Sequence, residues 1–209
     1  MDGWTDVGEV IKAIAPVFTA VAACFGVYLG FQGLGKWRDE TIGKRKTELA
    51  EQALIAFYEA RDVLRWARSR GFFGEEGSTR TPSAGESDKQ QEMRNTYFVP
   101  IERLNKKNEL FAKIQTTRYA FAAQFGENSL EPFNAILGVR NDIHMAASML
   151  IEMTYGDDTD SRFEQRAQPF LDTLGWGVST APDDIDRKIE KAVQDIEKTC
   201  RPVLTAMRG

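Results

Sequence analysis

The chain has 209 residues with 27 basic and 31 acidic side chains, which gives a net charge of −4. This mildly acidic balance argues against a broad nucleic-acid-binding surface, because phosphate contacts need clustered Lys and Arg. Two cysteines, Cys24 and Cys200, are too few for a disulfide framework. The length is enough for a single domain with its own hydrophobic core.

Residues 13–35 carry no charged side chain and form the first predicted element. A helix of this length reaches about 34 Å, more than the roughly 30 Å of a bilayer's hydrocarbon core. The run therefore predicts a transmembrane helix, preceded by a short extracytoplasmic tail over residues 1–12. Three alternatives stay open: a cleaved signal peptide, a lipoprotein modified at Cys24, and a buried helix of a soluble protein.

Small residues recur every four positions within this predicted span, at Ala22, Gly26 and Gly30. Such spacing lets two helix backbones approach closely inside a bilayer, where the familiar pattern is Gly-x-x-x-Gly. We therefore expect transmembrane self-association through this face, which would give a homodimer.

Positive charge follows the apolar run, whereas the tail before it is acidic. Cytoplasmic flanks of membrane spans carry an excess of Lys and Arg, so the N-terminus is predicted outside and residues 36–209 in the cytoplasm. This predicts a single-pass protein of the plasma (inner) membrane. Tryptophans at both ends of the span fit the interfacial aromatic belt. The predicted membrane-interface residues are Trp4, Lys36, Trp37, Arg38, Lys44, Arg45 and Lys46.

The next predicted elements are helical. Apolar residues at three-and-four spacing predict an amphipathic helix over residues 49–67. Residues 71–90 are rich in Gly, Ser and Pro and predict a mobile loop of unusual length. A second helix is expected from residue 88 to residue 125, with a kink or restart at Pro100.

The remaining elements complete a helical domain. Residues 128–131 match a capping box and predict the start of a third helix, which Gly156 would end. A short helix is expected over residues 162–174, and a last one begins at Asp183. The predicted fold is all-α: one N-terminal transmembrane helix followed by a four- to five-helix antiparallel bundle.

No motif for catalysis or metal binding emerges from the residues. His144 is the only histidine, and a single histidine does not supply a usual zinc site. The acidic run from Asp157 to Asp160 lacks the glycine and the glutamate of a calcium loop. We therefore predict no catalytic, cofactor-binding or metal-binding residue and no cofactor. An enzyme with an unrecognised carboxylate site is the alternative, with Glu102, Glu131 or Asp142 as candidates.

Several short motifs resemble one group of proteins, uncharacterised bacterial single-pass inner-membrane proteins with a helical cytoplasmic domain. The likeness covers most of the chain, and the group has no assigned activity, so the resemblance implies location rather than chemistry. The residues that carry it are Tyr97, Pro100-Ile101-Glu102-Arg103-Leu104, Arg118-Tyr119, Phe125-Gly126, Pro132-Phe133 and Cys200-Arg201-Pro202-Val203-Leu204.

These observations favour a membrane-anchored helical interaction or scaffold protein without catalytic activity. Its expected partners are the lipid bilayer, a second copy through the transmembrane helix and a cytoplasmic protein of unknown identity; nucleic acid is disfavoured. A different class is a membrane effector whose spans oligomerise and perturb the bilayer. Loss of membrane potential in expressing cells would distinguish that effector from an inert anchor.

Overall fold

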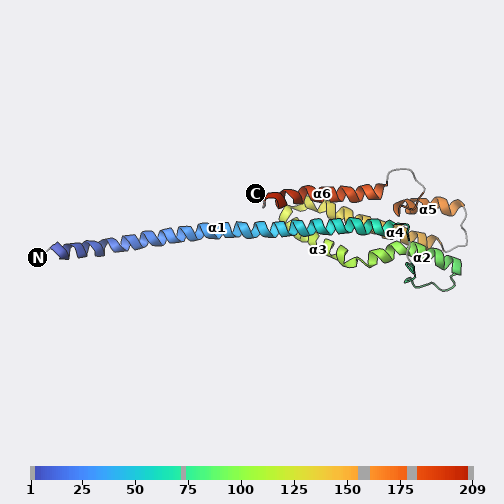
Figure 1. Ribbon diagram of the computed structural model, residues 1–209, viewed down its shortest axis with the longest axis horizontal. Coiled ribbons are helices and arrows are strands. Elements are labelled where there is room, and N and C mark those ends of the chain that lie inside the picture. The colour runs from blue at the N-terminus through green and yellow to red at the C-terminus, as the bar shows by residue number, and fades with distance from the viewer. Residues whose placement is uncertain (1–2, 72–73, 155–160, 178–182, 207–209) are drawn as a thin grey trace. The chain divides into compact units, whose positions relative to one another are not determined.

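The computed structural model describes residues 3–71, 74–154, 161–177 and 183–206, with side chains for all of these except 3–22, 24, 36, 39, 161 and 162 (Figure 1). Every regular element in these ranges is helical, which confirms the all-α class. The elements are α1 (Gly3–Arg68), α2 (Asp88–Asn105), α3 (Asn108–Phe125), the 3₁₀ turn η1 (Glu127–Leu130), α4 (Glu131–Met153), α5 (Ser161–Thr173) and α6 (Asp184–Ala206).

The chain divides into two units, Met1–Lys46 and Thr47–Gly209. The first consists of the N-terminal part of α1. No helix within the described part of the chain is long and apolar enough to cross a membrane. The structure describes no side chains for residues 13–22 and 24, which make up much of the apolar run at residues 13–35.

The second unit is a helical bundle with α4 at its centre. Helix α4 packs against α2, α3, α5 and α6, and residues 47–68 of α1 complete the core (Figure 1). Phe57 of α1 meets Phe133 of α4 edge to face at 5.0 Å between ring centroids, and Phe121 of α3 packs on Phe133 at 5.2 Å. Each such buried aromatic side chain contributes about 1.5–3 kcal/mol relative to exposure.

The apolar periodicity of residues 49–67 correctly predicted the buried face of α1. Seven of the eight stripe positions are buried, and Leu49 is partly buried against the same core. The buried positions are Ala53, Ala56, Phe57, Ala60, Val63, Leu64 and Ala67.

Two of the predicted helix boundaries are wrong. Pro100 lies inside α2, and the chain instead breaks between α2 and α3, where the Lys107 amide donates to the carbonyl of Leu104. The capping box expected at residues 128–131 does not form, because residues 127–130 make the 3₁₀ turn η1 and the Ser129 hydroxyl donates to the Gly126 carbonyl. Helix α4 begins at Glu131 without a side-chain cap.

The start of α6 agrees with the prediction. The Asp183 carboxylate accepts hydrogen bonds from the amides of Ile185 and Asp186, at 3.0 and 3.1 Å, and so caps two free N–H groups of the first turn. Helix α5 covers Ser161–Thr173, in agreement with the short helix expected over residues 162–174. The predicted stop at Gly156 falls outside the described residues.

Candidate functional site

The predicted self-association face lies in the first unit, on α1. Gly26 and Gly30 are exposed, and a methyl group added to either would meet no atom within 4 Å. Ala22 lies among the residues whose side chains are outside the described set. The two glycines therefore leave an open surface that no described part of the chain occupies.

The predicted interface residues follow on the same helix. Trp37 is 66% exposed, and Arg38 and Arg45 are exposed as well. The Lys44 ammonium lies 3.6 Å from the Glu40 carboxylate one turn earlier, and Lys46 is half-buried. Trp4 and Lys36 are outside the described side chains. The basic positions thus follow the apolar run within a few helical turns.

The apolar side chains of residues 25–37 are exposed on every side of α1. A helical residue advances by about 100° around the axis, so these positions cover the whole circumference rather than one stripe. The polar pair among them is satisfied locally, because the Gln32 amide donates to the Tyr28 hydroxyl at 2.7 Å. The exposed apolar residues are Phe25, Val27, Tyr28, Leu29, Phe31, Leu34 and Trp37.

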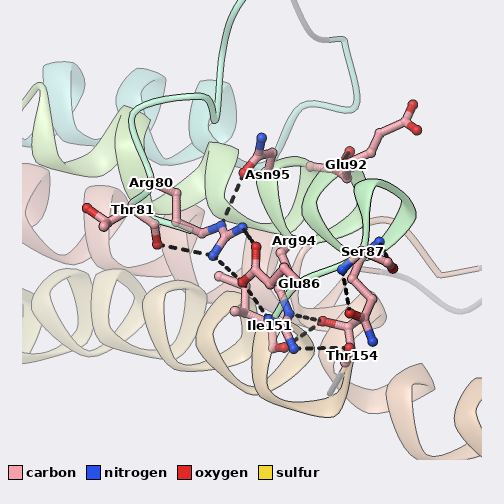
Figure 2. A network of polar contacts seen from close by, with 11 residues as sticks. Arg80, Thr81, Glu86, Ser87, Glu92, Arg94, Asn95, Ile151 and Thr154 are labelled. Atoms are coloured by element: carbon pink, nitrogen blue, oxygen red, sulfur yellow. Dashed lines mark hydrogen bonds and ion pairs between the residues drawn. The ribbon is translucent and has the colours of Figure 1, made fainter. Parts of the chain in front are cut away.

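In the second unit, a buried ion network joins the segment before α2 to α2 and α4. Figure 2 shows the Glu86 carboxylate between the guanidinium groups of Arg80 and Arg94. Arg94 also donates to the hydroxyl and the carbonyl of Thr154, at 3.0 and 3.2 Å, and Arg80 donates to the Asn95 side chain at 3.1 Å.

This arrangement keeps Glu86 ionised. Hydrogen bonds from Arg80, with further ones from the Ser83 amide and Arg94, hold the pKa of the Glu86 carboxyl far below its ordinary value. A carboxylate that stays charged and is shared by two arginines is unsuited to proton transfer near neutral pH. The network therefore acts as a structural clamp on residues 80–87.

A second contact fixes the same segment at Gly77. Its amide donates to the Glu102 carboxylate at 2.6 Å, and Lys106 lies 2.7 Å from the other carboxylate oxygen. Burial would raise the pKa of Glu102, but the hydrogen bonds from Lys106 and Gly77 keep that pKa below its ordinary value. Gly77 has a φ of +87°, and a Cβ there would lie 2.1 Å from the Asn95 carbonyl oxygen. Glu102 thus binds the backbone amide of a position at which only glycine fits.

Arg103 forms the third clamp and is fully buried. It donates to the carbonyl of Trp66, in the last turn of α1, at 2.8 Å and to that of Ser69, just after the helix ends, at 2.9 Å. It also contacts the carbonyl of Gly71. Its guanidinium pairs with the Glu76 carboxylate and lies 5.2 Å from the centre of the Trp66 ring. One side chain therefore caps α1 and ties the following segment to α2.

The two other candidate carboxylates lie on α4, beside a groove between α4 and α6. The groove has a volume of about 330 Å³, with Glu131 and Asp142 among its lining residues. Eleven residues of helix separate them by about 16 Å along the axis, too far to act on one substrate bond. Asp142 pairs with Lys188 of α6 at 3.6 Å. The structure therefore does not bring Glu102, Glu131 and Asp142 together.

A polar hollow of about 370 Å³ lies against α2, but Glu76, one of its lining residues, already forms an ion pair with Arg103. No cluster of three His, Cys, Asp or Glu side chains in the described ranges could hold a metal ion. Cys200 is fully buried, and burial raises the pKa of its thiol to about 12, so this thiol is unreactive. The acidic run at residues 157–160 lies outside the described residues.

Comparison of the chain with models of protein families, with curated proteins and with solved structures finds no match. The resemblance to inner-membrane proteins therefore stays a prediction from the sequence.

Proposed function

We propose that this chain is a membrane-anchored helical interaction protein without catalytic activity. Residues 13–35 would form its single transmembrane helix, with residues 36–209 on the cytoplasmic side. The observation that carries the proposal is the exposure of apolar side chains all around α1 between Phe25 and Trp37. A helix that is apolar on all faces belongs in lipid or in a large protein core.

Orientation is inferred from the residues that flank the run. Trp37 and the basic residues beyond it have the composition of a cytoplasmic interface, because positive charge is retained on that side. The internal hydrogen bond between Gln32 and Tyr28 also suits a bilayer, where polar groups need partners within the chain.

The buried charged side chains of the bundle support an interaction role, because they hold a loop segment in place. Glu86, Glu102 and Arg103 all hold the segment before α2 in place, and each is bound by several partners. A helical bundle with an open groove between α4 and α6 is suited to presenting a surface.

A charge placed within the exposed apolar segment tests the anchor. We expect Leu29→Arg combined with Phe31→Glu to shift the full chain out of floating membrane fractions, because charges at the centre of a span each cost about 2.5–3.5 kcal/mol. The matched control is Ile55→Arg, at a position on α1 that is also apolar and 56% exposed but lies in the bundle. Equal flotation of both variants would contradict the proposal.

A further inference from the structure

Two exposed arginines lie on one side of α1, within ten residues of the end of the apolar run. Arg38 and Arg45 are seven residues apart, close to two helical turns, so they share a side of the helix about 10.5 Å apart along its axis. Leu34 and Ile42, both exposed, lie on the same side at three- and four-residue spacing. These four residues form the arginine face, which is basic and apolar.

The neighbouring charges are on other sides of the helix or are already in contact with their own chain. The Lys44 ammonium lies 3.6 Å from the Glu40 carboxylate. Lys46 is half-buried and contacts its own chain. Asp39 directly follows the first arginine, about 100° further around the axis. Neither arginine forms an ion pair with any residue that the structure describes, so both guanidinium groups are open to an external anion.

The arginine face comes at the level of a bilayer surface, an argument that rests on the proposed anchor at residues 13–35. Arg38 is three residues past the span, about 4.5 Å beyond its end, and Arg45 is ten residues past it, about 15 Å. Each headgroup layer of a bilayer is about 5–8 Å thick. Because helical side chains lean toward the N-terminus, both arginines lean back toward the lipid. Arg38 would then lie among the lipid phosphates and Arg45 just outside them.

We infer that the arginine face binds the headgroup of an anionic phospholipid. The planar guanidinium of Arg38 suits a phosphate, to which it can donate two parallel hydrogen bonds. A zwitterionic headgroup carries an ammonium beyond its phosphate, where Arg45 repels it, whereas an anionic headgroup has no positive charge there. Leu34, one turn before Arg38, lies beside the acyl chains. The two arginines together therefore select anionic over zwitterionic lipid.

Lipid binding to the full chain in non-ionic detergent tests this inference. The probe is a mixed micelle with equal amounts of phosphatidylglycerol and phosphatidylcholine, and native mass spectrometry counts each lipid on the protein. We expect phosphatidylglycerol to predominate. Arg38→Gln with Arg45→Gln should lower the ratio of the two lipids by about fivefold for each arginine removed. The matched control, Lys188→Gln with Lys191→Gln, removes the same charge from the bundle and should keep the ratio.

Equal counts of the two lipids on the wild type, or an equal ratio in the arginine and lysine variants, would overturn the inference. Excess inorganic phosphate should leave the bound phosphatidylglycerol in place, and its displacement would also overturn the inference, by assigning the face to a soluble phosphate ion. The outcome is separable from that of the anchor, because the measurement is made in detergent. A chain that stays in alkali-washed membranes but shows no lipid preference contradicts this inference alone. A chain that is washed off but prefers phosphatidylglycerol contradicts the anchor alone.

Discussion

Replacement of Arg103 by Met should destabilise the bundle more than any other single change at its charged residues. The side chain is fully buried and contacts three carbonyls, the Ser69 hydroxyl and the Glu76 carboxylate. Methionine keeps the apolar stem but leaves Glu76 without its guanidinium partner. Removing one member of a buried ion pair costs about 3–5 kcal/mol, a large part of the roughly 5–15 kcal/mol that stabilises a typical domain.

The assay is urea unfolding of the full chain, followed by far-ultraviolet circular dichroism. Arg103→Lys is the matched control, because it keeps the charge but loses the planar fork that reaches several carbonyls at once. We expect its loss of stability to lie between the wild type and Arg103→Met. A double-mutant cycle with Glu76→Gln separates the ion pair from the cap on α1. A loss below about 1 kcal/mol for Arg103→Met would refute the reasoning, since it would equal a single neutral hydrogen bond.

Further predictions concern four glycines and Glu86. Gly77→Ala should lower the free energy of unfolding by more than about 1 kcal/mol, whereas Gly138→Ala should raise it by about 0.5–1 kcal/mol, both measured by urea unfolding. Gly26→Ile combined with Gly30→Ile should reduce cross-linked dimer in membranes without changing the bundle's melting temperature. An unchanged amount of dimer would contradict self-association through Gly26 and Gly30. Because Glu86 has a folded-state pKa below its ordinary 4.5, its stabilisation is complete above that pH and is lost as pH falls below it. Thermal melts from neutral to acidic pH should show this loss, and Glu86→Gln should weaken it.

The sequence predicted the parts of the fold that depend on periodicity. The stripe over residues 49–67 identified the buried face of α1, and Asp183 identified the start of α6, because both signals are local. The break between α2 and α3 was misplaced at Pro100. Lys107 and Asn108 occupy positions where a continuous stripe needs apolar residues, and that gap was the available signal.

The sequence did not predict which charged side chains are buried. Arg94 and Arg103 lie on an amphipathic helix where long charged residues are normally solvated, and their partners Glu86 and Glu76 come from a segment predicted only as a mobile loop. Such pairs depend on tertiary placement, which no local spacing encodes. For Gly77, the requirement for glycine became visible only in the structure, from its positive φ and from the Asn95 carbonyl that leaves no room for a Cβ.

The central claim is that residues 13–35 anchor the chain in a membrane, and alkaline extraction of membranes holding the full-length wild-type protein tests it most directly. The account predicts that the chain stays in the washed pellet and is released only by detergent. Release of the chain into the alkaline supernatant would contradict the anchor, and the proposed orientation and self-association through Gly26 and Gly30 would fall with it.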